Sequence, residues 1–329
     1  MKKVLFATSA LVMSAGFAVA EVAVSGDARM GMFYDGDDVQ FSSRARVLFT
    51  LTGESDAGLS FGASFRADQE NYNGDTRRSA ARGSAGVVWV SGTYGKLSMG
   101  DPVGAAEAAI GDLYAVGYTD GTFVRDREEI NFLVGDGNNK DQGPTILYEY
   151  SIDNISFFAS ATDGVDTSYG SLTEGDDCPD ALDCSSDKVA YSLAVKYDAG
   201  NWNAALSYSD HDEYSEIGLG AEATFDAFSV KGIYMDYDFD GTGEYLSNTI
   251  GLAGAYNVDA WTIKGFWRQD KLKTTVSSDS LKLDAFGIGA DYDLGGGATL
   301  AGGIANYDYI EGGVKTDDTV ADLGVKFKF

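Results

Sequence analysis

The stretch Thr319–Phe329, TVADLGVKFKF, alternates between two kinds of side chain along its whole length. A period of two places alternate residues on opposite faces of a β-strand. One face is wholly apolar, and the other carries Asp322, Lys326 and Lys328. This pattern is typical of a sheet with lipid on one side and water on the other. A soluble β-sandwich would alternate in the same way, so other parts of the chain have to decide between the two.

The first twenty residues have the form of a secretory signal. Lys2 and Lys3 precede an apolar run, and Ala18-Val19-Ala20 supplies small residues before Glu21. We predict that residues 1–20 are a cleaved signal peptide and that the protein is exported. The alternative, an uncleaved membrane anchor, needs about 20 apolar residues. No later stretch is long and apolar enough for a membrane helix, so a membrane-spanning form would have to be a barrel.

Composition and charge exclude one class of partner. The chain has 24 basic and 51 acidic residues, giving a formal charge of −27, and loss of Lys2 and Lys3 makes it −29. Nucleic-acid binding requires a basic surface, so we expect no nucleic-acid partner. The chain has 42 Gly, 19 Tyr and 18 Phe but only 3 Pro. Tyr and Gly in these numbers favour a barrel over the Leu- and Ile-rich core of a soluble sandwich.

Alternating segments recur through the whole sequence and predict about sixteen strands. Short turns such as Asp153-Asn154 and Gly295-Gly296-Gly297 separate some of them. Longer acidic connections separate others, and these are Asp163–Asp187, Asp236–Glu244, Gln269–Ser280 and Asp308–Asp318. Tight turns at one end and long loops at the other are typical of a transmembrane barrel. We therefore predict an all-β fold, a closed antiparallel barrel formed by residues 21–329 as one domain.

Side-chain parity places the charges of these strands inside the barrel. Arg44, Arg46 and Arg66 alternate with apolar residues and should face the lumen, because a charge at the lipid midplane costs roughly 2–4 kcal/mol. A barrel of about 16 strands leaves an aqueous channel. Small residues at expected inward positions favour an open lumen: Ser192, Ala194, Ala205, Ser207, Thr249, Gly251 and Ala253. Aromatic residues expected near strand ends, at the membrane interfaces, are Trp202, Tyr208, Tyr256, Trp261, Phe327 and Phe329.

Two motifs add a resemblance. The segment Gly95–Asp101, GKLSMGD, leads into a long acidic loop, and the chain ends in Val325–Phe329, VKFKF. Together with the export signal and the strand series, they resemble the general diffusion porins of Gram-negative outer membranes, of the alphaproteobacterial trimeric type. The resemblance implies a sixteen-stranded homotrimeric barrel in contact with outer-membrane lipid and lipopolysaccharide. It implies passive diffusion of small hydrophilic solutes and ions, with no enzymatic step and no required cofactor.

The interruption at residues 101–143 is too long for a hairpin turn, and loops of this length are usually functional. The resemblance implies that it folds inward as a third, constriction loop. Its predicted pore-facing acids are Glu107, Asp112, Asp120, Asp126, Glu128 and Glu129. Its apolar middle, Val103–Ile110 and Leu113–Val116, suits packing against a wall. The alternative is a solvated external loop.

A basic surface should face this loop. The predicted constriction arginines are Arg29, Arg44, Arg46, Arg66 and Arg82, with Arg77 and Arg78 nearby. Guanidinium groups stay charged at any working pH. Opposed acids and bases across a narrow lumen create a transverse field that favours small polar solutes. The alternative is that some of these arginines only form structural ion pairs.

Two features of the predicted loops suggest a bound calcium ion and a disulfide. Asp236, Asp238, Asp240 and Glu244 match part of a calcium-binding EF-hand loop, but Ser247 stands where the bidentate Glu should be. They could form a structural Ca²⁺ site, and the alternative is a solvated acidic turn. Cys178 and Cys184 are the only cysteines of an exported chain, and we predict a disulfide between them rather than a metal pair.

Three other functions are alternatives to the channel. His211 is the single histidine, and a barrel lipase would have to build a triad around it and Ser209; we predict no enzyme. A substrate-specific channel would need an ordered aromatic track along the lumen. A structural or adhesive barrel would have a closed lumen filled by large, mutually paired side chains.

Overall fold

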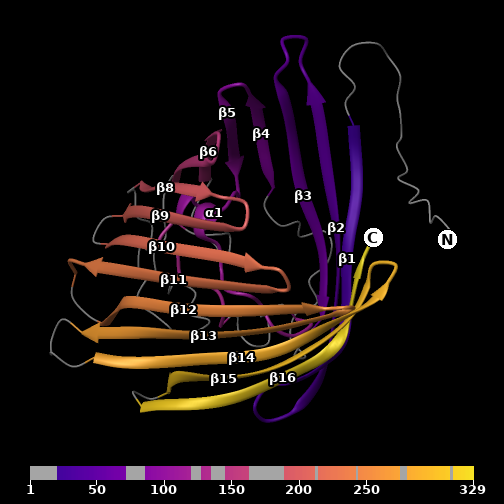
Figure 1. Cartoon of the computed structure of the whole chain (residues 1–329), viewed down its shortest axis with the longest axis vertical. Coiled ribbons are helices and arrows are strands. Elements are labelled where there is room, and N and C mark those ends of the chain that lie inside the picture. The colour runs from indigo at the N-terminus through magenta and orange to yellow at the C-terminus, as the bar shows by residue number, and fades with distance from the viewer. Residues whose placement is uncertain are drawn as a thin grey trace, which may run out of the picture.

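The computed structural model describes residues 21–71, 86–119, 127–134, 145–162, 189–211, 214–241, 244–274, 280–311 and 314–329. Within them, sixteen strands form a closed antiparallel barrel in which each strand pairs with its neighbours in sequence (Figure 1). The predicted fold class is therefore confirmed. No helix of this described part is long and apolar enough to cross a membrane.

The strands differ greatly in length around the barrel. Their bounds are β1 Glu21–Tyr34, β2 Val39–Glu54, β3 Ser60–Asn71, β4 Val87–Gly92, β5 Gly95–Gly100, β6 Thr145–Ile152, β7 Ile155–Thr162, β8 Ala190–Asp198, β9 Trp202–His211, β10 Tyr214–Phe225, β11 Phe228–Phe239, β12 Glu244–Val258, β13 Trp261–Thr274, β14 Ser280–Gly295, β15 Ala298–Glu311 and β16 Val314–Lys328. One short helix, α1 Ala105–Ile110, lies in the long connection after β5. β4 and β5 have six residues each, whereas β14 has sixteen.

The C-terminal segment closes the barrel. β16 pairs with β1 from Asp27 opposite Lys328 to Tyr34 opposite Ala321. The amide of Phe329 donates to the carbonyl of Gly26 at 2.9 Å, so the pairing extends to the last residue. Leu323 is 52% exposed on the outer face and Asp322 is 7% exposed on the inner face. The predicted alternation of this strand is confirmed.

Three predicted loops are shorter than expected. β11 continues through Asp236 to Phe239, β13 continues to Thr274, and only residues 312 and 313 separate β15 from β16. The acidic residues of these segments suggested loops. A strand that projects beyond the membrane has water on both faces, but it keeps its hydrogen bonds to the neighbouring strands. The fourth predicted loop, Asp163–Asp187, lies outside the described residues, as do the signal segment 1–20 and both cysteines.

The turns at the opposite end are tight and use residues that tolerate positive φ. Asp153, Asp226 and Asp259 have φ between 50° and 54° and each begins a two-residue turn. Asp is among the few non-glycine residues that adopt this conformation readily. Such turns match the twist of the hairpin strands, and they fix the register of β6–β7, β10–β11 and β12–β13.

Outward aromatic residues mark two levels on the barrel. At the turn end, rings pair across strands: Tyr197–Trp202 at 5.4 Å, Phe228–Tyr256 at 4.4 Å and Trp261–Tyr292 at 4.7 Å. At the loop end, polar atoms of the rings donate to carboxylates: Tyr208 to Asp210, Tyr234 to Asp236 and Trp267 to Asp284, at 3.1–3.2 Å. Tyr and Trp favour a position where one end is dry and the other wet. The two levels are therefore the edges of the apolar band.

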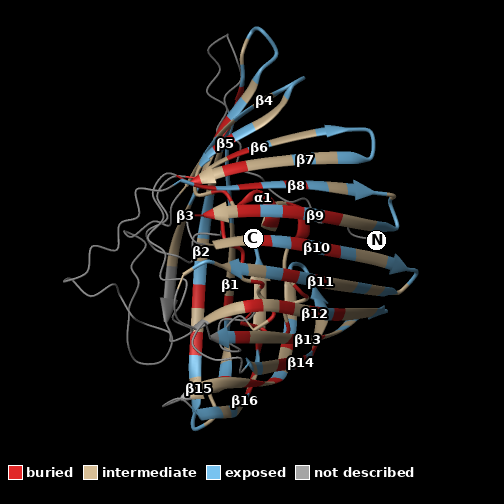
Figure 2. Ribbon diagram, turned by 90° about the vertical axis from the view of Figure 1, so that its left-hand side faces the viewer, coloured by how far each residue is buried: buried red, intermediate tan, exposed pale blue. Residues whose placement is uncertain are grey.

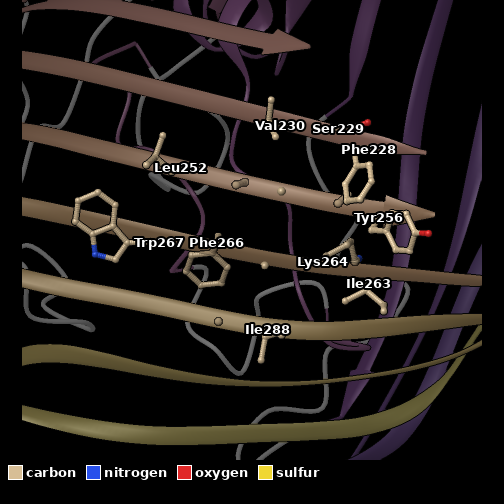
Figure 3. A pocket seen from close by; sticks show the side chains of 15 residues that line it. Phe228, Ser229, Val230, Leu252, Tyr256, Ile263, Lys264, Phe266, Trp267 and Ile288 are labelled. Carbon is tan, nitrogen blue, oxygen red and sulfur yellow. The ribbon is translucent and has the colours of Figure 1, made fainter. Parts of the chain in front are cut away.

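A hollow of about 540 Å³ lies on this apolar band, over β11–β14 (Figure 3). Gly254 and Gly265 are cross-strand neighbours there and leave the sheet without side chains. Phe228, Tyr256 and Trp267 stand around them. The hollow opens on the outer face and is separate from the lumen.

Candidate constriction site

The helix α1 in the third loop is anchored by the wall of the barrel. Its sequence, AAEAAI, favours a helix because alanine has the highest helix propensity. Gly104 provides no side-chain cap, so the wall supplies one: Ser160 of β7 accepts from the Ala105 amide at 2.9 Å, and Ser192 of β8 from the Ala106 amide at 3.1 Å. The helix lies inside the barrel beside β8 and β9 (Figure 2). The predicted inward folding of this loop is thus seen in its first limb.

Inward glycines continue the path of this limb along the wall. A Cβ on Gly218 of β10 would lie 2.8 Å from Ile110, one on Gly251 of β12 would lie 2.8 Å from Leu113, and one on Gly324 of β16 would lie 2.7 Å from Tyr118. Val116 lies over Gly287 and Gly289 of β14 in the same way. These separations are shorter than ordinary Cβ contacts, so side chains of the loop pack closely against the sheet where these wall positions are glycine. The limb crosses from β7 to β16 and β1.

From the sequence, the small inward residues suggested an open lumen, but in the structure they do not border open space. The loop covers them: Ser192, Ala194, Ala205, Ser207, Thr249 and Ala253 are all 9% exposed or less. Ala194, Ala205 and Ala253 belong to one apolar cluster with Ala109, Ile110 and Leu113 of the loop. Small side chains on the inner face of β8–β12 make room for the loop. The channel is the part of the lumen that the loop leaves open.

One carboxylate holds the tip of the described limb. Asp322 of β16 accepts hydrogen bonds from the amides of Tyr118, Thr119 and Gly303 at 3.2, 3.1 and 3.0 Å. It also accepts from Thr119 Oγ1 at 2.6 Å. A buried carboxylate is tolerated when donors satisfy it, and charge-assisted hydrogen bonds are among the stronger ones. Arg29 of β1 donates to the carbonyl of Thr119 from the other side. The tip is thus bound to both strands of the closing pair.

A second carboxylate holds the returning limb, residues 127–134. Glu216 of β10, 1% exposed, accepts from the Leu133 amide at 2.8 Å and from Ser209 Oγ at 2.7 Å. Tyr237 of β11 donates to the carbonyl of Asn131 at 2.5 Å, and Arg268 of β13 donates to that of Glu129. The wall therefore binds this limb through backbone groups that any loop sequence would present.

The two limbs also bind each other and the wall between these anchors. Asp112 accepts from the Ile130 amide at 2.8 Å, and the Leu113 amide donates to the carbonyl of Glu128 at 3.2 Å. Arg127 lies 3.9 Å above the ring of Tyr307 of β15, within cation–π distance. The described limbs of the loop, residues 101–119 and 127–134, are consequently folded and joined by hydrogen bonds.

Tyr114 of the loop forms a short hydrogen bond with a carboxylate of the wall. Its hydroxyl donates to Glu222 of β10 at 2.6 Å. Burial and the hydrogen bond to this carboxylate raise the pKa of Tyr114 well above its ordinary value. Burial likewise raises the pKa of Tyr118. Both phenols therefore stay protonated at every physiological pH, and Tyr114 keeps its donor.

The predicted arginines line the part of the wall at β1–β3. Arg44 pairs with Asp27 at 3.3 Å, and Asp68 pairs with both Arg46 at 3.3 Å and Arg66 at 2.8 Å. Exposure of the side chain rises along this series, from 8% for Arg44 to 23% for Arg46 and 39% for Arg66. Arg46 and Arg66 are the most accessible of the described set, whereas Arg29 is 3% exposed and bound to the loop.

The predicted acids occupy different environments. Glu107 on α1 and Glu129 are half-buried, Asp112 binds the Ile130 amide, and Glu128 is only 3% exposed. Arg77, Arg78, Arg82, Asp120 and Asp126 lie outside the described residues. Sequence reasoning missed Glu216, Asp322, Arg268 and Tyr237 as anchors of the loop. The sequence did contain a signal for the two carboxylates. Glu216 and Asp322 occupy inward positions whose inward neighbours on the same strand are glycines: Gly218 and Gly220 for Glu216, and Gly324 for Asp322.

The residues of the predicted calcium site are not arranged as an EF-hand. Asp236 and Asp238 lie on the outer face of the extended strand β11, where Asp236 accepts from Tyr234. Asp240 follows the strand, and Glu244 begins β12. Among the residues described, no three His, Cys, Asp or Glu side chains gather closely enough for a metal ion. A Ca²⁺ site at Asp236, Asp238, Asp240 and Glu244 stays a prediction.

Comparisons with known proteins agree with this architecture. A family model described as Gram-negative porin matches residues 7–311. A porin of Rhodobacter capsulatus is 38% identical over 330 residues, spanning 94% of this chain and 100% of the relative. A porin of Fuscovulum blasticum is 27% identical over 322 residues, spanning 94% of this chain and 100% of its own length. A porin structure refined at 1.8 Å resolution superposes with a TM-score of 0.72 at 35% identity, again spanning 94% of this chain and 100% of that structure.

Proposed function

Because the chain belongs to the Gram-negative porin family and is a diffusion channel of the outer membrane, we propose that its selectivity is set between the third loop and the arginines of β1–β3. The observation that carries the proposal is the placement of the loop. Its described limbs cover the wall from β7 to β16 and reach β1, and the guanidinium groups of Arg46 and Arg66 face the lumen from β2 and β3.

The electrostatics follow from this placement. Glu107 and Glu129 are partly exposed on the loop, and the carboxylates of the arginine cluster, Asp27 and Asp68, are already paired with arginines. Fixed charges of opposite sign on two sides of a narrow aqueous passage orient water and dipolar solutes. An apolar solute gains nothing from such a field and would have to displace water that hydrates the charged groups. The solutes that fit are small, hydrophilic molecules and ions.

No catalytic step belongs to this proposal. His211, the single histidine, is 1% exposed and cannot meet a solute in the lumen. Neutral general acid–base chemistry would depend on that side chain. The passage that we propose is passive.

The proposed assembly is a homotrimer with β1–β5 at its centre. β4 and β5 have six residues each, bounded by non-strand residues, and a strand that faces lipid needs about 9–11. Their outward residues are nevertheless apolar and exposed in one chain: Val88 is 62% and Met99 is 52% exposed. Contact with neighbouring barrels would cover this short wall, since lipid cannot do so across its full thickness. Native mass spectrometry of the refolded protein should give three chains per particle, and a monomer would contradict this assembly.

Planar bilayers test the selectivity proposal. Single insertions of the wild type under a KCl gradient should give open channels with a measurable reversal potential. Arg44→Gln/Arg46→Gln removes two lumen charges and leaves Asp27 without its partner, so the permeability of K⁺ relative to Cl⁻ should rise by about twofold or more.

A matched control removes the same charge from the outer face. Lys271→Gln/Lys282→Gln changes the net charge equally but lies outside the lumen, so its reversal potential should equal that of the wild type. Equal shifts in both variants would contradict a local role for the arginines. A silent bilayer from a folded barrel would favour a structural barrel with a closed lumen.

A further inference from the structure

The inner wall of the barrel carries exposed apolar side chains beside the arginine cluster, toward the turn end. Leu48 of β2 is the direct cross-strand partner of Arg66 on β3, and it is 36% exposed. Val87 and Trp89 of β4 are half-buried. We call Leu48, Val87 and Trp89 the lumen apolar patch. Water in the channel therefore meets apolar surface next to guanidinium groups.

Trp89 faces the lumen and lies against Gly62 of β3. Its neighbours Val88 and Val90 are 62% and 39% exposed on the outer face, so the alternation along β4 places Trp89 inside. A Cβ on Gly62 would lie 2.5 Å from Cζ2 of the Trp89 ring, so the glycine leaves the space that the ring occupies. The other three tryptophans of the chain lie on the outer face, and these are Trp202, Trp261 and Trp267.

The third loop covers other large apolar side chains of the inner wall but leaves this patch open. Leu147 and Phe266 are 4% and 5% exposed, and they belong to one buried cluster with Ile110 and Leu113 of the loop. Lipid and neighbouring barrels touch only the outer face, so neither can cover Leu48. What covers the patch in the open channel is therefore water or a passing solute.

The guanidinium groups next to the patch have donors for a further carboxylate. Arg46 and Arg66 share one acid, Asp68, at 3.3 and 2.8 Å. Both contacts use the Nε atom of the arginine, and the Nη groups carry the remaining N–H donors. The two side chains are 23% and 39% exposed, so a solute in the lumen can reach them. A guanidinium group matches the planar, bidentate geometry of a carboxylate.

The charged and apolar parts lie at a spacing that one solute can bridge. Arg66 and Leu48 form one cross-strand pair, and Gly62, which lies beneath the ring of Trp89, is four residues away along β3. Four residues of strand span about 13 Å. Val87 pairs with Ser64, halfway between the two positions. An acid with an apolar tail of about this length therefore reaches from the arginines to the ring.

We propose that Arg46, Arg66 and the lumen apolar patch form a binding subsite for amphipathic carboxylates. The solute carboxylate accepts from Arg46 and Arg66, and its apolar tail lies along Leu48 and ends on the ring of Trp89. These contacts remove apolar surface of both partners from water, which favours binding. The inference rests on the proposed function, because the solute has to enter the lumen. It adds that the channel holds such acids longer than small ones such as acetate.

Blockade of single channels in planar bilayers tests the subsite. 6-Phenylhexanoate is added to a KCl solution on one side, and the fraction of time for which the current is interrupted gives the half-blocking concentration. For the wild type this concentration should be about tenfold or more below that of acetate. Trp89→Ala should raise the half-blocking concentration of 6-phenylhexanoate about tenfold, because the ring contact is lost. Arg46→Gln/Arg66→Gln should raise it by a similar factor, because the charged donors are lost.

Matched controls separate the subsite from effects on the bilayer. Trp261→Ala makes the same substitution on the outer face and should be blocked like the wild type. 6-Phenylhexylammonium has the same tail with a positive head, and it should block the wild type about tenfold more weakly than the acid. Equal blockade by the two probes would contradict the role of the arginines.

The proposal is wrong if Trp89→Ala is blocked like the wild type, or if Trp261→Ala loses the blockade equally. An unblocked wild type whose reversal potential still depends on Arg44 and Arg46 would overturn this inference alone and leave the selectivity proposal standing. If Trp89→Ala does not fold, Leu48→Asn, which keeps the size of the side chain, takes its place. It should raise the half-blocking concentration about threefold, and an unchanged value would contradict the proposal.

Discussion

Replacing Asp322 by Asn should release the tip of the constriction loop while leaving the barrel closed. Oδ1 of Asp322 accepts the amides of Tyr118 and Gly303, and Oδ2 accepts the amide and hydroxyl of Thr119. Asn has an NH₂ group in place of one of the two oxygens: in one orientation the bond from the Tyr118 amide is lost, and in the other the bond from the Thr119 amide is lost, while the Thr119 hydroxyl can turn to accept instead. At least one bond to the loop tip is therefore lost, and a hydrogen bond to a charged group contributes about 1.5–3 kcal/mol. Even the lower figure raises the ratio of released to bound tip by about tenfold.

Single-channel recording measures the release directly. The variant should show larger current fluctuations and an altered conductance, because a charged loop tip then moves within the lumen. Limited proteolysis at the loop should also become faster. Asp317→Asn on the outer face of the same strand is the matched control, because Asp317 binds Asn306 and has no contact with the loop among the described residues. Wild-type fluctuations and proteolysis in a folded Asp322→Asn channel would refute the anchoring role of this carboxylate.

Three further substitutions probe other contacts of the loop. Gly251→Val places side-chain atoms where a Cβ alone would lie 2.8 Å from Leu113; it should displace the loop into the channel and lower conductance, and unchanged conductance would show that the wall yields instead. Arg268→Lys loses the fork that binds Asp270 and the Glu129 carbonyl; proteolysis within residues 127–134 should become faster, and equal rates would contradict this anchor. Tyr114 has a raised pKa in the folded protein, so its bond to Glu222 is fully present below the ordinary tyrosine pKa of about 10 and is lost only as pH rises through the raised value. Conductance of the wild type and of Tyr114→Phe should therefore depend on pH in the same way between pH 7 and 9. A transition in this range that is present in the wild type and absent from Tyr114→Phe would contradict the raised pKa of Tyr114.

Period-two patterns predicted the barrel because each strand meets lipid on one face. That condition is local, so the parity of Arg44, Arg46 and Arg66 could be read from neighbouring residues alone. The lengths of β11, β13 and β15 could not be predicted in this way, because strand ends beyond the membrane have water on both faces and no apolar alternation. Their acidic ends therefore resembled loops. These ends are strands because they form hydrogen bonds with the neighbouring strand, which a single segment of sequence does not show.

The path of the loop was the part least accessible to sequence reasoning. Small wall residues have two readings: they widen a lumen, or they receive another segment. Ala194 and Gly251 distinguish these only once Ile110 and Leu113 are placed against the wall. Buried carboxylates gave the better clue, because Glu216 and Asp322 on an inner face need donors. The sequence shows the need, and only the fold shows that loop amides meet it.

The attachment of the loop tip to Asp322 and Arg29 has a consequence for assembly. Asp322 lies on the last strand, β16, and Arg29 on the first, β1, and the pairing of these two strands, the seam, closes the barrel. A segment from the first half of the chain thus staples that seam from within. The tip can take its final place only after both ends of the chain have met, because Asp322 and Arg29 do not lie together earlier, whereas the anchors on β7–β13 do not depend on the seam. A barrel that is open at the seam therefore lacks the attachment of the loop tip, and a fixed tip indicates that the barrel has closed.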